Sequence, residues 1–169
     1  MAIMALVAEG GITPSAEDVA ARAQVGLRSV FRHFKDMESL YAEMMLRLAR
    51  GYEAAMAPFE TTGWHAQLFE AIGRRFGVYE TMLPYKRASD AHRHESPTIQ
   101  RMHDGITVLL RARLQAVMPP HLAGNQIAFE TLDMLLSVDT WSRLRVDQKL
   151  SPEIARQVIE TQVAALIVQ

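Results

Sequence analysis

Four basic side chains lie close together near the N-terminus with no acidic residue between them. Arg22, Arg28, Arg32 and Lys35 fall in the stretch 19–35, which contains no Asp or Glu. Cations gathered in this way neutralise backbone phosphates and release counterions, which supplies most of the sequence-independent affinity of proteins for DNA. The cluster therefore indicates phosphate binding. An ordinary helical hairpin with a solvated basic face is the alternative interpretation of the same spacing.

A second group of chemically capable residues lies in the most polar stretch of the chain. Asp90, His92, His94 and Glu95 carry oxygen and nitrogen donors that suit zinc or nickel, and His103 follows one to two helical turns later. On a helix, however, His92 and His94 point away from each other, and only Asp90 and His94 share a face. We favour a solvated short helix and loop without a metal, and an interaction with a partner or a phosphate stays open.

Composition narrows the class of protein. The chain has 169 residues, 49% of them hydrophobic, a net charge of −1 and no cysteine. This length allows one compact unit or a small domain fused to a larger one, and the charge requires any nucleic-acid binding to come from a local patch. The absence of cysteine excludes a disulfide scaffold and thiolate chemistry, and it fits a cytoplasmic protein.

The sequence contains no recognisable catalytic motif, cofactor-binding motif or membrane-spanning segment. The sequence has no nucleophile with a base and an orienting group at catalytic spacing, and no Gly-rich phosphate loop. No apolar run has the length of a membrane span, and the N-terminus lacks the basic segment of a signal peptide. We therefore expect no enzymatic activity, no cofactor and no membrane association. An enzyme built on the cluster around Asp90 is the weaker alternative.

Two short helices must position the basic cluster. Ser15 and Asp18 form the pattern of a capping box, which predicts a helix of about two turns after Ser15. A break follows at 24–26, where Gly26 is expected to supply the backbone freedom of the turn. A second helix is predicted at 27–34, and two helices around such a turn form a helix-turn-helix whose second helix fits a DNA major groove. The side chains of this helix that are expected to pack inward are Val30, Phe31 and Phe34. Those expected to face outward are Arg28, Ser29, Arg32 and His33.

The run 16–41 resembles the DNA-binding signature of the tetracycline-repressor (TetR) family of transcription regulators. That signature contains Ile-Ala, Ala-Gly-Val-Ser, Thr-Leu-Tyr, His-Phe and a helix opened by Lys-Glu-x-Leu. The residues in register with it are Val19-Ala20, Ala23, Val25, Ser29-Val30-Phe31, His33-Phe34, Glu38 and Leu40. The resemblance implies an all-α fold with a three-helix DNA-binding domain at 1–41 and a helical ligand-binding and dimerisation domain at 42–169. The first helix, predicted at 1–9, is shorter than in relatives, which carry another turn and a basic arm.

Four positions depart from the family pattern. The family's turn Gly is Gln24 here, its Ser is Gly26, its Tyr is Phe31 and the lysine that opens its fourth helix is Met37. Phe31 loses a hydroxyl donor, Met37 loses a charge, and Gly26 cannot supply a capping hydroxyl. We therefore expect weaker binding to the DNA backbone, or binding through other groups such as Lys35.

The resemblance also implies which residues meet operator DNA. Arg28 and Arg32 are expected to reach guanine edges or phosphates, because arginine is the side chain that most often does so. The neighbouring side chains should fix the position of the protein on the backbone. The full set of expected DNA-binding residues is Ser15, Leu27, Arg28, Ser29, Phe31, Arg32, His33 and Lys35.

Apolar residues at helical spacing predict further helices at 36–57, 62–83, 96–118, 125–146 and 151–168. Pro58 and Pro84 are expected to end the first two of them. Gly51 should weaken the first by about 1 kcal/mol relative to Ala. Ser-Pro pairs at 96–97 and 151–152 give good helix starts, with Ser as the cap and Pro in the first turn.

The resemblance implies that an unknown small-molecule effector binds among the helices from Thr62 onward. Aromatic and Met side chains there suggest an apolar cavity, although the same residues can form a plain core. The candidate lining residues are Phe69, Phe76, Tyr79, Met82, Met102, Phe129 and Trp141. Three arginines, Arg74, Arg75 and Arg143, are candidates to meet an acidic group of the effector.

The last two predicted helices are apolar over more than one face, which indicates a partner. In the family this pair forms a four-helix bundle with its symmetry mate. The resemblance thus implies a homodimer through Asn125–Val146 and Ser151–Val168 that binds a palindromic operator, is released by an effector and represses transcription. The alternative is a helical protein-interaction module that does not bind DNA.

Overall fold

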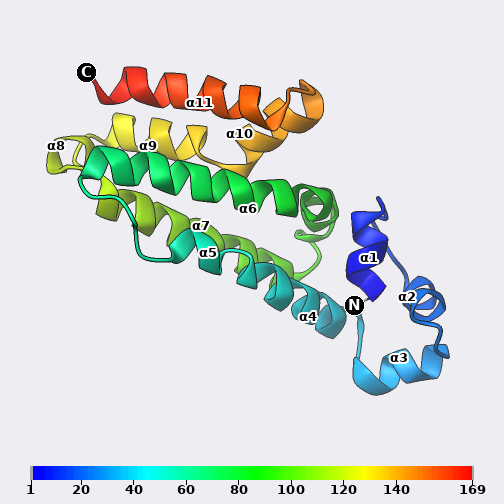
Figure 1. The fold of residues 1–169 in the computed structure, drawn as a ribbon. Coiled ribbons are helices and arrows are strands. Elements are labelled where there is room, and N and C mark those ends of the chain that lie inside the picture. Colours follow the sequence, from blue (N-terminus) through cyan, green and yellow to red (C-terminus); the bar gives the residue numbers. More distant parts are fainter. Residues whose placement is uncertain (1, 169) are drawn as a thin grey trace. The chain divides into compact units, whose positions relative to one another are not determined.

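The computed structural model describes residues 2–168, which are helical without a strand (Figure 1). The all-α expectation is confirmed. None of the helices in this range is long and apolar enough to cross a membrane. The elements are α1 (Ala2–Ala8), α2 (Ala16–Ala23), α3 (Leu27–His33), α4 (Met37–Arg50), α5 (Glu53–Met56), α6 (Trp64–His92), α7 (Pro97–Val117), α8 (Pro120–Ala123), α9 (Gln126–Leu135), α10 (Val138–Ser142), the π-helical segment η1 (Arg143–Asp147) and α11 (Pro152–Ile167).

Contacts divide the chain into two compact units that do not follow chain order. Unit 1 takes the described residues up to Gly51 and adds Thr81–Ile106. Unit 2 takes Tyr52–Glu80 and the described residues from Thr107 onward. Helices α6 and α7 therefore each contribute residues to both units. The functional division expected at 41/42 stays a prediction.

Unit 1 is built around the contacts of α1 with α2 and of α2 with α3. The capping box is present: the Ser15 hydroxyl accepts from the Asp18 amide at 3.1 Å, and the Asp18 carboxylate accepts from the Ser15 amide at 2.8 Å. It starts α2 because it satisfies amides that have no partner inside the helix. The buried core side chains of unit 1 are Ile3, Val7, Val19, Ala20, Val30, Leu40, Met44, Met45, Leu48, Ala88 and Ile99.

The turn between α2 and α3 contradicts one expectation. Gln24, the C-cap of α2, takes the left-handed conformation with φ 55°, and its amide donates to the carbonyls of Ala20 and Ala21. Gly26 has φ −69°, an ordinary value for any residue, and acts as the N-cap of α3 without a side-chain hydrogen bond. Gln24 therefore supplies the unusual conformation, and the assignment of that role to Gly26 was wrong.

Two predicted helix ends were also wrong. The helix predicted at 36–57 breaks at Gly51, where the C-cap of α4 is followed by a turn and the short α5. A Cβ at Gly51 would lie 3.1 Å from Met82 Cε, so glycine permits this close approach. Helix α6 continues through Pro84, which lies exposed. Tyr79 and Ala88 are buried on either side of it, and we attribute the continuation to their packing, which outweighs the lost backbone bond.

Unit 2 is organised by α6, α7, α9 and α11, and α9 contacts α11 (Figure 1). The helix predicted at 125–146 is divided at Leu136, because Ser137 caps a new helix by accepting from the Thr140 amide at 3.1 Å. The Ser-Pro starts of α7 and α11 are confirmed. Side chains that are almost fully buried in this unit are Leu68, Ile72, Tyr79, Leu114, Leu132, Leu136, Trp141, Ile159 and Val163.

Candidate functional site

Helix α3 buries one apolar edge and turns the rest of its surface outward. Val30 is buried in the core of unit 1, and Phe34 packs against that core. Phe31 was expected to pack inward, but 46% of it is exposed, because Val30 and Phe34, four residues apart, already fill the inner face of this two-turn helix. Leu27 is 37% exposed. The helix therefore offers a mixed aromatic and cationic surface to solvent.

The cations of this surface differ in their partners. Arg22 is held by Glu9, with Nη1 donating to Oε2 at 3.1 Å and Nη2 forming a second contact. Arg28, Arg32 and Lys35 are exposed and form no ion pair with any residue in the range 2–168. Three unpaired cations thus lie on or directly after one short helix. They can meet phosphates without first breaking an internal bond.

The remaining predicted DNA-binding residues lie on and beside the same helix. His33 is exposed at the end of α3, and Ser29 is half-buried near its start. Ser15 lies before α2, where its hydroxyl donates to Asp18 at 2.8 Å. The bond from the Ser15 amide, and next this bond from its hydroxyl, lower the pKa of Asp18, so the carboxylate stays charged beside the hydroxyl. A contact from Ser15 to phosphate would have to compete with that carboxylate.

One carboxylate that anchors α4 was not assigned a role from the sequence. Glu38, in the first turn of α4, accepts from the Ser96 hydroxyl at 2.7 Å and from the Thr98 amide at 2.9 Å. Burial opposes its ionisation, but the hydrogen bonds from Thr98 and Ser96 outweigh this and lower the pKa of Glu38. Glu38 thereby ties α4 to the N-terminus of α7 within unit 1. The Ser-Pro start of α7 was visible in the sequence, but its distant partner was not.

The structure gives the polar residues around Asp90 separate partners. Asp90 pairs with Lys86 at 2.5 Å, and His92 Nε2 lies 3.1 Å from the Ile12 carbonyl while its ring stacks on Tyr41. His103 Nε2 lies 3.1 Å from Arg93 Nη1. Within the described part of the chain, no three His, Cys, Asp or Glu side chains are close enough to hold a metal ion. The contacts of Asp90, His92 and His103 are those of a helix end packed in unit 1.

The candidate effector-binding residues fall into two sets. Met82 and Met102 pack against the core of unit 1. Phe69, Phe76, Tyr79, Phe129 and Trp141 belong to unit 2, where the rings of Phe76 and Trp141 stack with their centroids 4.3 Å apart. The structure therefore brings together part of the predicted set, around a buried aromatic cluster on α6 and α10.

Polar bonds fix that aromatic cluster. Trp141 Nε1 donates to Glu80 at 2.8 Å, and Arg145 Nε donates to the same carboxylate oxygen at 2.7 Å. The hydrogen bond from Arg145 is the main reason that the pKa of Glu80 is lowered. Tyr79 donates its hydroxyl to the Leu136 carbonyl at 3.0 Å. Burial raises the pKa of Tyr79, so this hydroxyl stays protonated.

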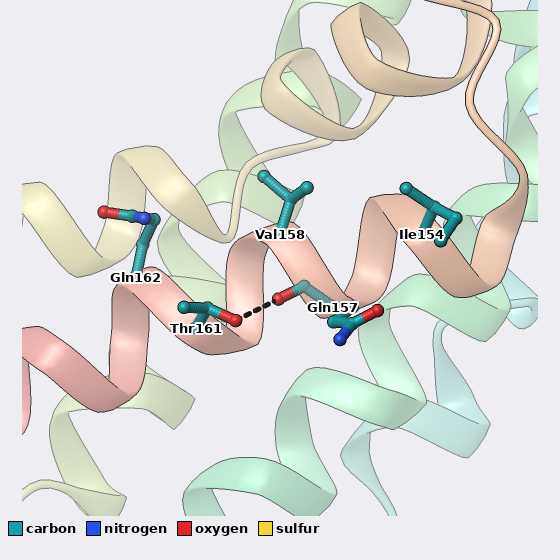
Figure 2. A pocket seen from close by; sticks show the side chains of 5 residues that line it. All are labelled: Ile154, Gln157, Val158, Thr161 and Gln162. Atoms are coloured by element: carbon teal, nitrogen blue, oxygen red, sulfur yellow. Dashed lines mark hydrogen bonds between the residues drawn. The ribbon is translucent and has the colours of Figure 1, made fainter.

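Helix α11 has an exposed face without charged side chains. Residues 154, 158, 161, 165 and 168 repeat at alternating steps of four and three, the spacing of a helix-packing seam, and they are Ile, Val, Thr, Ala and Val. Figure 2 shows the first part of this face, where five side chains line an open hollow of about 300 Å³. They are Ile154, Gln157, Val158, Thr161 and Gln162.

The neighbouring helix α9 also exposes apolar side chains. Ile127 is 81% exposed and Met134 is 60% exposed, and Thr131 lies between them on the same face with its hydroxyl bonded to the Ile127 carbonyl. Positions 127, 131 and 134 have the same four-three spacing as the face of α11. Exposed apolar rows of this kind are suited to packing against other helices.

Comparison with known proteins identifies the N-terminal part of the chain. Residues 2–44 match the family described as bacterial regulatory proteins, tetR family. Searches of curated proteins and of solved structures find no match. The matched range contains α1, α2, α3 and the first half of α4, and so includes the exposed basic helix described above.

Proposed function

We propose that this chain, a DNA-binding transcriptional regulator whose N-terminal domain is of the tetR family, acts as a homodimeric repressor that a small-molecule effector releases from a palindromic operator. DNA binding resides in residues 1–41, and ligand binding and dimerisation reside in 42–169. The protein works in the cytoplasm, where bacterial DNA lies, and it has no enzymatic activity.

The observation that supports DNA recognition most directly is the surface of α3. Arg28 and Arg32 are exposed, are four residues apart on one helix, and have no ion-pair partner in the range 2–168. On a helix lying in the major groove, such side chains reach guanine O6 and N7 or the flanking phosphates. Ser15, Leu27, Ser29, Phe31, His33 and Lys35 then set the position of the helix on the DNA backbone.

Dimerisation supplies two such helices to one operator. Because the exposed faces of α9 and α11 combine apolar side chains with four-three spacing, they suit a four-helix bundle formed with the same helices of a second copy. A twofold dimer would match the symmetry of a palindromic site, with the two recognition helices about one DNA turn apart.

Effector response requires two shapes of the protein with different effector affinities. A ligand bound among the helices of unit 2 would favour the shape that does not fit the operator, which is a shift of population. The candidate residues in this unit are the aromatic side chains around Phe76 and Trp141. Since α6 and α7 belong to both units, they are the elements through which we expect the response to pass.

Binding to DNA from upstream of the protein's own gene tests the assignment of α3 as the recognition helix. Replacement of Arg28 or Arg32 by Ala should weaken binding by about 5- to 100-fold, the value of a good arginine contact. Arg143→Ala is the matched control, because Arg143 is an exposed arginine of unit 2 that pairs with Asp147. Fluorescence anisotropy at several salt concentrations measures the affinity. Equal affinities in the wild type and both α3 variants would contradict the assignment.

The oligomeric state tests the interface. Val158→Lys places a charge in the uncharged face of α11 and should convert the dimer to a monomer in light-scattering chromatography. Val108→Lys is the matched control, since Val108 is an exposed valine of α7 that lies outside both faces. A wild-type chain that elutes as a monomer would refute this interface. A dimer that binds no DNA would instead favour a helical protein-interaction module.

A further inference from the structure

Arg75 stands out among the charged residues of unit 2 because it lies inside the core. Only 3% of its surface is exposed, and it lies on α6 one turn before Tyr79. Its Nη2 donates to the Leu110 carbonyl, and its guanidinium also bonds the Tyr79 hydroxyl. Both acceptors are neutral. The charge of Arg75 is therefore hydrogen-bonded but not balanced.

Most other arginines of this unit have carboxylate partners, and Arg113, which has none among residues 2–168, is less buried and lies over the ring of Phe59. Arg74 pairs with Glu70 at 2.5 Å, Arg145 with Glu80 at 2.7 Å, and Arg111 with Asp133 at 2.6 Å and with Glu130 at 2.7 Å. Asp133 is the acidic group that acts on Arg75 through space, but it is bonded directly to Arg111. Within residues 2–168, no carboxylate forms an ion pair with Arg75.

A buried charge without a counter-charge is expensive for a folded protein. Moving a cation from water into an apolar interior costs several kcal/mol unless an anion or several strong hydrogen bonds offset it. Burial accordingly lowers the pKa of Arg75, although arginine stays protonated in proteins. Leucine or methionine would fill such a position without this cost, so the cation calls for a functional reason.

The surroundings of Arg75 are suited to an acid with an apolar body. The Tyr79 hydroxyl lies beside the guanidinium, and Tyr52 is close enough to interact with Arg75 electrostatically. The ring of Phe76 lies 6.3 Å from that of Tyr79 and stacks on Trp141. A guanidinium and tyrosine hydroxyls bind carboxylates through charge-assisted bonds, and neighbouring aromatic rings bind apolar groups.

From these contacts we infer that the effector is an organic acid, with its carboxylate bound by Arg75 and by the Tyr79 hydroxyl, which would exchange its bond to the Leu136 carbonyl for one to the ligand, and with its apolar part against the rings of Phe76 and Trp141. The inference rests on the proposed effector response and specifies the chemical class of the ligand. The carboxylate would supply the negative charge that the residues around Arg75 lack. The other candidates for an acidic group fit this role less well, because Arg74 is bonded to Glu70 and Arg143 is exposed and paired with Asp147.

Calorimetric titration of the full chain with matched acids and amides tests the inference. The acids are benzoate, phenylacetate and octanoate, and the amides are benzamide, phenylacetamide and octanamide, which have nearly the same shape without the charge. At least one acid should bind about 10- to 100-fold more tightly than its amide, the value of hydrogen bonds to a charged group. If no acid is preferred over its amide, the inference is wrong.

Three variants locate the site. Arg75→Met should reduce the affinity for the preferred acid to that of its amide, and Tyr79→Phe should weaken it about 10-fold, the value of one hydrogen bond to a charged group. Arg143→Met, which removes an exposed arginine of the same unit, should bind the acid as the wild type does. If Arg75→Met does not fold by circular dichroism, Tyr79→Phe and the acid–amide comparison decide. An acid preference that persists in Arg75→Met, or an acid affinity of Tyr79→Phe equal to that of the wild type, overturns the assignment.

Anisotropy on promoter DNA separates this inference from the proposed regulator function. The preferred acid should weaken DNA binding by the wild type, and its amide should not. Acid binding without an effect on DNA affinity would refute the effector role while leaving the anion site in place. Normal DNA binding together with equal binding of acid and amide would refute only the anion site.

Discussion

The arginines of α3 and those of unit 2 have the same chemistry but different surroundings. Arg28 and Arg32 lie in solvent without an ion-pair partner in the range 2–168, whereas Arg74, Arg111 and Arg145 are held by carboxylates. Arg75 combines burial with the lack of a carboxylate. An exposed, unpaired arginine costs the fold little and can bind a polyanion, whereas a buried, unpaired one destabilises the fold until an anion reaches it.

The salt dependence of binding should differ most strongly between the exposed cations of α3 and the buried Arg75. Arg28, Arg32 and Lys35 of two subunits give six exposed cations, so promoter affinity should fall about 10³-fold between 50 and 200 mM salt. Binding of an acid at Arg75 should fall less than about threefold, because a buried pair is screened far less. Anisotropy and calorimetry over the same salt series provide the two slopes. Equal slopes would contradict the distinction between the two regions.

Removal of an arginine should have opposite effects at two positions of unit 2. Arg111→Met should lower the free energy of unfolding by about 1–2 kcal/mol, because Glu130 and Asp133 would be left side by side without their cation. Arg75→Met should raise it by about 1 kcal/mol, because it removes a buried charge without exposing another. Urea unfolding measures both values. Equal destabilisation by the two substitutions would mean that the protein itself balances the charge of Arg75.

Acid should turn a paired arginine of unit 2 into an unpaired one. Hydrogen bonds from Thr61, and next from the Glu60 amide, are the main reasons that the pKa of Glu70 falls from 4.5 to about 2, and Arg74 adds to them. Because the folded-state pKa is the lower one, this contribution to stability is complete above pH 4.5 and is lost as the pH falls towards 2. Thermal unfolding should therefore depend less on pH between 4.5 and 2 in Glu70→Gln than in the wild type. Identical pH dependence in both proteins would contradict this role.

Local rules predicted much of the fold from the sequence. The capping box at Ser15 and the Ser-Pro starts of α7 and α11 depend on residues three or four positions apart, and all three are present. The basic stretch was also visible, since charge needs no tertiary information. The match of residues 2–44 to the tetR family agrees with the resemblance seen in these same positions.

Contacts between distant residues were beyond such rules. No acidic residue follows Arg22 closely in the sequence, yet Glu9, 13 positions before it, lies against it in the structure. Helix α6 passes Pro84 because side chains before and after it are buried in different units. The balance of charge at Arg75 likewise depends on which carboxylates the fold brings close, so Arg74 and Arg75 looked equivalent in sequence and are not.

The smallest expected effect concerns the turn that places the exposed arginines of α3. Gln24 holds φ 55°, which costs a residue with a side chain about 1 kcal/mol and costs glycine almost nothing. Gln24→Gly should therefore raise the free energy of unfolding by up to about 1 kcal/mol in urea titrations. Gly26→Ala is the matched control: its φ is −69° and no atom lies within 4 Å of the added Cβ, so it relieves no strain, and it should be neutral or slightly destabilising because alanine is a poorer N-cap than glycine. No gain from Gln24→Gly would mean that the left-handed conformation at Gln24 costs the turn no stability. The expected result would mean that the strain at Gln24 affects only the stability of the turn. Promoter affinity, measured where both variants are fully folded, should then change less than twofold, because neither substitution removes a cation from α3.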